Sequence, residues 1–279
     1  MSGTQAWGFT DDRGAEPAAA RVPRRVVAYA RAGAALLDLG VRPVAVYGSG
    51  HDGERLDPAK AGGLAAAGVP YLGPGRALDE GLLRELRPEV IVDVTYDGKS
   101  PYALDEALAE RLGVPLVALS VGNELALPAI LGRFAALAAS LEADPAADRE
   151  AVRELAAAEA ALGDVAARSG LAVLALSGAG PEQVHLARPQ AWPELAHLAG
   201  LGLRFLDPGP GPGANWLTGD WARAVELRPG LVLFDEREHA TPPYELPAGV
   251  RLTPWSPETP PSPAAYARFF RVLAEALEA

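Results

Sequence analysis

This sequence predicts an α/β fold of two Rossmann-like lobes with parallel sheets joined by one long linker helix. Short apolar runs alternate with stretches of helical periodicity, which is typical of βαβ units. The motif Glu-Leu-Arg-Pro occurs twice, at residues 85–88 and 226–229, each time directly before an apolar run. Between the two copies, residues 146–168 are Ala-rich with apolar residues at helical spacing. The repeat suggests two similar lobes, although a helix that ends before a strand is common in any α/β protein.

Each predicted strand is a short apolar run bounded by Gly, Pro or charged residues. The predicted strands are residues 25–29, 43–47, 90–94, 116–121, 171–176, 184–187, 203–206, 231–234 and 250–252. Helical spacing predicts further helices at residues 33–39, 79–86, 104–112, 125–142, 192–198, 220–227 and 262–277. Because strands alternate with helices, parallel sheets are expected.

The stretch 146–168 has the charges and the ending of a single helix. Asp148 lies near its start and Arg168 near its end, where they complement the helix dipole, and Gly170 follows. We predict one helix of about 23 residues, roughly 35 Å long. It divides the chain into an N-terminal lobe at residues 1–145, a linker helix at 146–169 and a C-terminal lobe at 170–279. An ordinary packing helix of a single domain is the alternative.

The composition argues against several classes of function. The net charge is −11 and no basic stripe is present, so no nucleic-acid partner is expected. The chain has no cysteine, which excludes disulfides and thiolate metal sites. Its histidines do not pair at metal-ligand spacing, and neither a Gly-x-Ser-x-Gly elbow nor a Walker loop occurs. No catalytic residue, metal site or cofactor is therefore predicted.

Two features bear on location. No apolar run approaches the roughly 20 residues that span a bilayer. Residues 1–10 lack the basic and apolar regions of a signal peptide. We therefore expect either a cytoplasmic protein or an extracytoplasmic, membrane-associated one whose native signal has been removed.

Ligands of open parallel sheets bind beyond the carboxyl ends of the strands. That rule nominates the following side chains: Tyr29, Arg31, Tyr47, His51, Tyr96, Lys99, Trp192, Asn215, Trp216, Arg237 and Trp255. Tyr and Trp offer a large contact area with a polar tip, and Arg or Lys could neutralise a catecholate or carboxylate. A hydroxamate–iron complex would instead need flat aromatic walls and a few donors. For each aromatic residue, ordinary packing in the core is the alternative.

A Pro-Gly run at residues 207–213 cannot form regular structure. It is expected to be a loop that borders the ligand site, or a simple connector.

Several segments follow one another in a characteristic order. They are residues 7–14 (WGFTDDRG), 23–29 (PRRVVAY), 36–46 (LLDLGVRPVAV), 86–92 (LRPEVIV) and 215–220 (NWLTGD). Their order and spacing resemble the helical-backbone, or class III, periplasmic substrate-binding proteins of ABC importers for ferric siderophores, haem and cobalamin. The resemblance covers nearly the whole chain.

The resemblance implies a solute-binding protein that captures a ferric siderophore or similar organic metal chelate in a cleft between two lobes. It implies an ABC permease as partner, and no enzymatic activity. In that family an acidic residue of each lobe docks on the permease, and the counterparts here are Glu80, or its neighbour Asp79, and Asp220. A solvated helix N-terminus explains such residues equally well. The alternative function is a leaderless cytoplasmic protein that uses the same fold as an enzyme or carrier in a biosynthetic pathway.

Overall fold

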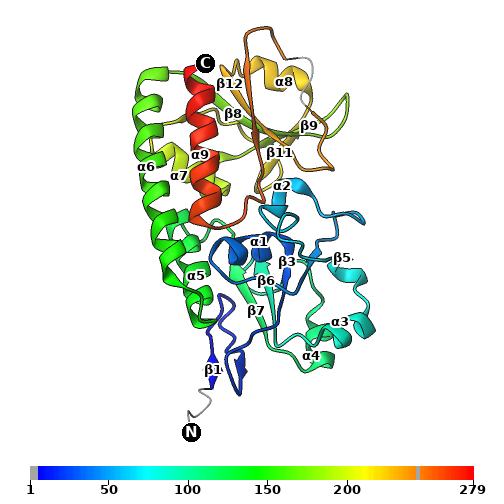
Figure 1. Cartoon of the computed structure of the whole chain (residues 1–279). Helices are drawn as coiled ribbons and strands as arrows, with labels where there is room; N and C mark the ends of the chain where they lie inside the picture. The colour runs from blue at the N-terminus through cyan, green and yellow to red at the C-terminus, as the bar shows by residue number, and fades with distance from the viewer. Residues whose placement is uncertain (1–5, 243–245) are drawn as a thin grey trace. The chain divides into compact units, whose positions relative to one another are not determined.

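The structure, a computed structural model, describes residues 6–242 and 246–279, and its chain divides into two compact units (Figure 1). Unit 1 comprises Met1–Ala151 and Pro260–Ala265, and unit 2 comprises Val152–Thr259 and Tyr266–Ala279. Each unit has its own sheet, with helices between the strands. The α/β fold class predicted from the sequence is confirmed.

The sheet of unit 1 has five parallel strands in the order β5-β4-β3-β6-β7. Their bounds are β3 Val26–Tyr29, β4 Ala45–Gly48, β5 Tyr71–Pro74, β6 Val90–Thr95 and β7 Leu116–Ser120. All residues of β3, β4, β6 and β7 are buried. That burial explains why these strands are continuous apolar runs rather than alternating ones. Within this sheet the strand that the sequence did not predict is β5, since Tyr71–Pro74 contains Gly and Pro.

The elements of unit 1 outside this sheet are a hairpin and several helices. They are the hairpin strands β1 Trp7–Gly8 and β2 Ala18–Ala19, the 3-10 helix η1 Gly75–Ala77, and the helices α1 Ala30–Asp38, α2 Pro58–Ala61, α3 Glu80–Leu86, α4 Glu106–Leu112 and α5 Leu127–Ser140. Asp57, Asp79 and Asp105 cap α2, α3 and α4, because each carboxylate accepts a backbone N–H from the first turn.

The sheet of unit 2 is mixed, with the order β11-β9-β8-β12-β13 and a short β10 beside β8. Its strands are β8 Ala172–Gly178, β9 Val184–Ala187, β10 Arg204–Phe205, β11 Trp216–Gly219, β12 Leu231–Asp235 and β13 Arg251–Trp255. The expectation of parallel pairing holds for β8, β10, β12 and β13 and is wrong for β9 and β11. Residues 179–183 are too few for a parallel crossover, so β9 must run back along β8.

The helices that lie wholly in unit 2 are η2 Pro189–Ala191, α7 Pro193–Gly200 and α8 Trp221–Glu226. Asp220 caps α8 through a hydrogen bond from the backbone N–H of Arg223. Residues 215–220 therefore form a strand and a helix cap.

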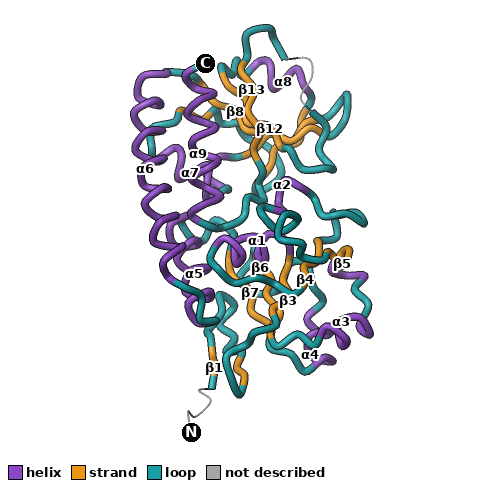
Figure 2. The backbone as a smooth tube through the Cα atoms, viewed as in Figure 1, coloured by secondary structure: helices purple, strands orange, loops and turns teal. Residues whose placement is uncertain are grey.

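Two longer helices, α6 Pro145–Ser169 and α9 Pro263–Glu278, are continuous along their length (Figure 2). The apolar side of α6 is formed by Leu155, Ala158, Leu162 and Val165, which are buried at helical spacing. Both helices begin in unit 1 and end in unit 2. The lobe boundaries at residues 145 and 169 stay a prediction.

The segment Pro260–Ala265 belongs to unit 1, although the sequence suggested that everything after residue 170 lies in the second lobe. Ser262 Oγ donates a hydrogen bond of 2.5 Å to Asp38 Oδ2 of α1. This contact joins two residues that are far apart in the sequence, so no local pattern indicated it.

The repeated Glu-Leu-Arg-Pro motif is also repeated in the backbone. Arg87 and Arg228 adopt left-handed conformations, with φ of 48° and 52°, directly before the prolines. Proline disfavours the helical conformation in the preceding residue, and a left-handed residue ends a helix. In both units the chain then enters a buried strand, β6 or β12.

Candidate ligand-binding site

Most candidate residues follow the carboxyl ends of parallel strands, whereas Trp192 and Trp216 lie where antiparallel β9 ends and β11 begins. The group in each unit is called its edge and is described by itself. The unit 1 edge consists of Arg31, Ser49, Asp52, Lys60 and Tyr96. The unit 2 edge consists of Trp192, Trp216, Asp235, Arg237, Trp255 and Glu258. Ligands of open α/β sheets bind at such edges.

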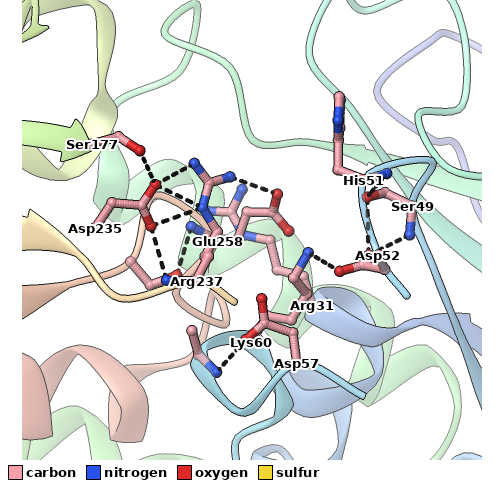
Figure 3. Close-up of polar contacts among 12 residues, drawn as sticks. Arg31, Ser49, His51, Asp52, Asp57, Lys60, Ser177, Asp235, Arg237 and Glu258 are labelled. Carbon is pink, nitrogen blue, oxygen red and sulfur yellow. Dashed lines mark hydrogen bonds and ion pairs between the residues drawn. The ribbon is translucent and has the colours of Figure 1, made fainter. Parts of the chain in front are cut away.

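A buried ion pair lies at the centre of the unit 1 edge (Figure 3). Lys60 Nζ lies 2.8 Å from Asp52 Oδ1, and the side chains are 1% and 3% exposed. The other carboxylate oxygen, Asp52 Oδ2, accepts hydrogen bonds from Ser49 N at 2.6 Å and Ser49 Oγ at 2.9 Å. Two buried charges are stable only when they are paired and hydrogen-bonded, as here.

Gly48 makes room for this pair. A Cβ at Gly48 would lie 2.9 Å from Asp52 Oδ2 and 2.2 Å from the hydroxyl of Tyr71. Lys60 was missed by the sequence prediction, although Asp57-Pro58, an N-cap residue followed by Pro, is a recognisable helix start.

Arg31 and Tyr96, both predicted, are brought together. Arg31 is only 3% exposed, and its Nη1 donates to Tyr96 OH at 3.1 Å. The ring of Tyr96 packs edge-on against Tyr102, with centroids 4.8 Å apart. Because Tyr96 is half-buried, part of its ring remains available to a ligand.

Tyr29 and Tyr47 do not form an exposed surface, contrary to the prediction. Both are 0% exposed and belong to the apolar core of unit 1. Their rings lie 6.3 Å apart, and the Tyr47 hydroxyl donates to Asp93 Oδ2 at 3.2 Å. Burial and the neighbouring Asp93 raise the pKa of Tyr47 well above its ordinary value. In this structure the two rings pack inside the core of unit 1 and are not accessible to a ligand.

Asp93 anchors the loop that carries Tyr96 and Lys99. Its carboxylate accepts backbone N–H groups from Ala103 at 3.1 Å and Leu104 at 2.8 Å. Complete burial raises its pKa from 3.8 to about 6, and the hydrogen bonds oppose that rise only in part. The core of unit 1 therefore contains a carboxyl group whose pKa is raised to about 6.

Two predicted residues of unit 1, His51 and Lys99, are exposed. The backbone of His51 donates to Ser49 Oγ at 3.2 Å, and that of Lys99 donates to Asp97 Oδ1 at 2.9 Å. Backbone hydrogen bonds from Ser100 and Lys99 lower the pKa of Asp97.

Three predicted tryptophans form one cluster in unit 2. Ring centroids are separated by 4.9 Å for Trp192 and Trp216, by 5.8 Å for Trp192 and Trp255, and by 5.9 Å for Trp216 and Trp255. Trp192 and Trp255 are 7% and 1% exposed, whereas Trp216 is half-buried. Trp216 therefore presents the accessible face of the cluster.

The indole nitrogens of Trp192 and Trp255 differ in their hydrogen bonding. Trp192 Nε1 donates to the carbonyl of Asn215 at 3.1 Å. Trp255 Nε1 is buried and has no hydrogen-bond partner among the residues that the structure describes. Asn215, also predicted, thus acts through its backbone, which holds Trp192 beside Trp216.

Arg188, which was not predicted from the sequence, holds the Pro-Gly run in place by hydrogen bonds. Its guanidinium donates to the carbonyls of Gly209 at 2.8 Å, Gly211 at 2.9 Å and Gly213 at 3.0 Å. These glycines have φ of 89°, 151° and 92°, values that other residues rarely adopt. The loop is therefore clamped, and it leads directly into Asn215 and Trp216.

Arg237, the remaining predicted residue of unit 2, lies between two carboxylates (Figure 3). Its Nη2 donates to Asp235 Oδ2 at 2.7 Å, and its Nη1 donates to Glu258 Oε1 at 3.0 Å. Ser177 Oγ also donates to Asp235 Oδ2, at 2.7 Å. Asp235 and Glu258 are each 2% exposed, and neither was predicted.

The candidate docking residues have structural partners of their own. Asp220 Oδ1 accepts from Arg223 N at 2.9 Å, and Asp79 caps α3 in the same way. Glu80 pairs with Arg84 at 2.7 Å and Arg111 at 3.0 Å, and these hydrogen bonds lower its pKa. A docking role stays a prediction.

Two properties of the described residues concern metals and membranes. Within residues 6–242 and 246–279, no group of three or more His, Asp or Glu residues is placed to hold a metal ion. Over the same part of the chain, every helix is too short or too polar to cross a bilayer.

No protein-family model and no curated protein matches the chain. Solved structures do match. The chain is similar to DesE, a ferric-siderophore receptor protein from Streptomyces coelicolor, with 27% identity, a TM-score of 0.85 and 98% of each chain covered.

More distant structures share the fold. A siderophore periplasmic binding protein from the fuscachelin gene cluster of Thermobifida fusca has 15% identity, a TM-score of 0.62 and coverage of 92% of this chain and 96% of its own. The periplasmic haem-binding protein RhuT from Roseiflexus sp. RS-1 has 17% identity, a TM-score of 0.61 and coverage of 91% and 97%.

These matches confirm the resemblance drawn from the sequence: the chain has the fold of the two-lobed periplasmic binding proteins. Those relatives are binding or receptor proteins by their descriptions. Among them, the similarity to the Streptomyces coelicolor receptor extends over nearly the full length of both chains.

Proposed function

We propose that this protein binds a ferric siderophore, or a similar organic iron chelate, reversibly and without chemical turnover. The observation that carries the proposal is the similarity to a ferric-siderophore receptor over 98% of both chains, at 27% identity. Each edge by itself is suited to recognition, because unit 1 has the half-buried Tyr96 and unit 2 the half-buried Trp216, each beside hydrogen-bonded charges.

The polar groups of the unit 2 edge also favour binding over catalysis. Ser177 donates to Asp235, and Arg237 already binds that carboxylate. An activated serine would need a neighbouring base that is free to take its proton. The Ser177–Asp235–Arg237 network is instead a stable, charge-paired support for the edge.

The test is a titration of tryptophan fluorescence with ferric siderophores, ferric citrate and haem. We expect saturable quenching by at least one ferric siderophore, with native mass spectrometry giving one chelate per chain. Trp216→Phe should alter the quenching amplitude, whereas Trp221→Phe, in α8 outside the cluster, should leave affinity unchanged. If no ferric siderophore binds in either measurement, the proposal is wrong; saturable binding of haem alone would assign the protein to a different cargo.

Delivery to an ABC permease and a location outside the cytoplasm follow from the same proposal. Asp220→Asn keeps a side chain that can cap α8 but removes its charge. We expect it to leave chelate affinity unchanged and to reduce chelate-stimulated ATPase activity of the cognate importer in vesicles. Asp105→Asn, at the cap of α4, is the matched control. Equal stimulation by all three proteins would exclude Asp220 from docking.

A further inference from the structure

Resting on the proposed function, we infer that Asp93 is a positioning residue of the unit 1 edge. Its buried carboxylate fastens the loop of residues 96–104, and protonation of that carboxylate loosens the loop and weakens chelate binding. All the contacts involved lie within unit 1.

This loop leaves the end of β6 and returns to the same strand. Its return arm is fastened at two adjacent residues of β6. Tyr102 N donates to the Val94 carbonyl at 2.9 Å, and Leu104 N donates to Asp93 Oδ2 at 2.8 Å. Ala103 N lies 3.1 Å from Asp93 Oδ2 and 3.3 Å from Asp93 Oδ1. Asp93 therefore closes the loop through its side chain.

The return arm connects Asp93 to the accessible Tyr96. Tyr102, directly before Ala103, packs edge-on against Tyr96, with ring centroids 4.8 Å apart. The Tyr102 ring also lies edge-on against the buried Tyr29, at 5.8 Å. Because Tyr102 contacts both rings, a return arm that moves away from Asp93 also moves the surface that supports Tyr96.

The hydroxyl of Tyr47 gives Asp93 two hydrogen-bonding arrangements. It lies 3.2 Å from Asp93 Oδ2 and 3.4 Å from the Val92 carbonyl, so its proton can be donated to either. When Asp93 is protonated at Oδ2, that O–H can donate to the Tyr47 oxygen, which then donates to Val92. A protonated carboxyl oxygen is a weaker acceptor than a carboxylate oxygen, so the bonds from Ala103 N and Leu104 N weaken.

The surroundings of Asp93 bring this change into an accessible pH range. Complete burial raises its pKa from 3.8 to about 6, and the backbone hydrogen bonds from Val94, Leu104 and Ala103 oppose the rise. Those bonds oppose the rise because they favour the ionised form, so protonation must weaken them. The loop is thus fastened at neutral pH and loosened at about pH 5.

Each element packed around Asp93 presents an identifiable group. β4 presents Tyr47, whose pKa is raised well above its ordinary value, so this hydroxyl stays protonated. β3 presents Tyr29 beside Tyr47, and α2 presents the ion-paired Lys60, whose Nζ lies 5.8 Å from the centroid of the Tyr29 ring. β7 places Ala118, which does not titrate, opposite Asp93 in the sheet.

The first measurement needs no ligand. Amide hydrogen exchange, followed by NMR, gives the protection factors of Ala103 and Leu104 at about pH 7.5 and about pH 5. We expect both to fall about fivefold or more at the lower pH. The protection of Ile91, whose N–H donates to the Pro115 carbonyl at 2.9 Å, should not fall. Unchanged protection of Ala103 and Leu104 would overturn the inference, and so would an equal fall at Ile91.

The second measurement follows binding by calorimetry, with the ferric siderophore that quenches tryptophan fluorescence most strongly in the titration above. We expect its affinity to be about tenfold lower at about pH 5 than at about pH 7.5. At about pH 6, a comparison of two buffers with different ionisation enthalpies should show that binding releases protons, because the fastened loop favours the ionised carboxyl.

Asp93→Asn separates this residue from other titrating groups, including those of the chelate. The variant cannot ionise, so its affinity should change less than about twofold over the same pH range. Asp105→Asn, at the exposed cap of α4, should keep the full change. A change in Asp93→Asn as large as in the native protein would place the titrating group elsewhere and overturn the inference.

If Asp93→Asn does not fold, amide exchange and proton release in the native protein decide, and absence of either effect would overturn the inference. If no ferric siderophore binds at any of these pH values, the proposed function fails, and amide exchange alone decides whether Asp93 fastens the loop.

Discussion

The sheets of unit 1 and unit 2 share a core of three neighbouring parallel strands in the same order. They differ in the strands that flank this core on one side. β3, β6 and β7 are neighbours in unit 1, as β8, β12 and β13 are in unit 2. On the other side of β3 the sheet continues with parallel strands β4 and β5, whereas β8 pairs there with the short parallel β10 and with β9, which is antiparallel both to β8 and to β11.

This difference decides the chemistry of the two edges. In unit 1 the loop after β4 supplies Ser49 and Asp52, which meet Lys60 in a buried polar cluster. In unit 2 β11, which pairs antiparallel with β9, carries Trp216, and Trp216 meets Trp192 after β9. One scaffold thus supports a polar edge and an aromatic edge. We expect the polar edge to matter mainly for stability and the aromatic edge mainly for binding.

The largest effect is expected at the buried pair of the polar edge. Lys60→Ala leaves the Asp52 carboxylate buried without its cation, and should lower the free energy of unfolding by about 3–5 kcal/mol. Arg168→Ala, which breaks the exposed pair with Glu278, should cost less than about 1 kcal/mol. Urea unfolding followed by circular dichroism measures both. Equal losses of unfolding free energy in the two variants would show that the buried Lys60–Asp52 pair contributes no more to stability than an exposed pair.

Asp93 should make the stability of unit 1 depend on pH. Its folded pKa of about 6 lies above the ordinary value of 3.8, so folding penalises the ionised form. The resulting stability is fully present below about pH 4 and is lost as the pH rises through 6, a change of about 3 kcal/mol.

Asp93→Asn tests this origin. The difference in unfolding free energy between the native protein and the variant should shift by about 3 kcal/mol between pH 4 and pH 7. Asp105→Asn, at an exposed helix cap, should show no comparable shift. A pH-independent difference for Asp93→Asn would contradict the elevated pKa.

The aromatic edge is tested by truncating its accessible ring. Trp216→Ala should weaken chelate binding by about 2 kcal/mol, roughly 30-fold, because aromatic anchors carry much of the binding energy. The loss of stability should be smaller than for the buried Trp255→Ala, which we expect at about 3–5 kcal/mol. Calorimetry and urea unfolding separate the two effects. Unchanged affinity in Trp216→Ala would remove this ring from the ligand site.

The smallest effect is expected at the clamp of the Pro-Gly loop. Arg188→Lys keeps the charge but cannot donate to three carbonyls at once, and should weaken binding by about 1 kcal/mol through the position of Trp216. A shift in the tryptophan emission maximum should accompany the loss. Arg204→Lys, whose guanidinium donates to the carbonyl of Gly170, is the control. Identical emission and affinity in Arg188→Lys would show that the loop holds its shape without the clamp.

Local patterns were enough to predict most of the fold. The apolar runs at β6 and β12 and the helical spacing of α6 depend on neighbours within a few residues. The left-handed Arg before Pro, Arg87 after α3 and Arg228 after α8, is also set by adjacent residues. Helix caps at Asp79 and Asp220 belong to the same short-range class. The sequence also indicated Trp192 and Trp255, which follow predicted strands, and Trp216, which follows the Pro-Gly run and begins β11 in the structure.

Only the tertiary structure decided which predicted side chains are accessible and which charges are paired. Tyr29, Tyr47 and Tyr96 end three strands alike, yet only Tyr96 is left partly exposed. The pairs Lys60–Asp52 and Arg237–Glu258, and the contact of Ser262 with Asp38, join residues from separate elements. Periodicity and capping are properties of adjacent residues, whereas burial and ion pairing depend on the packing of distant ones, which no local pattern encodes.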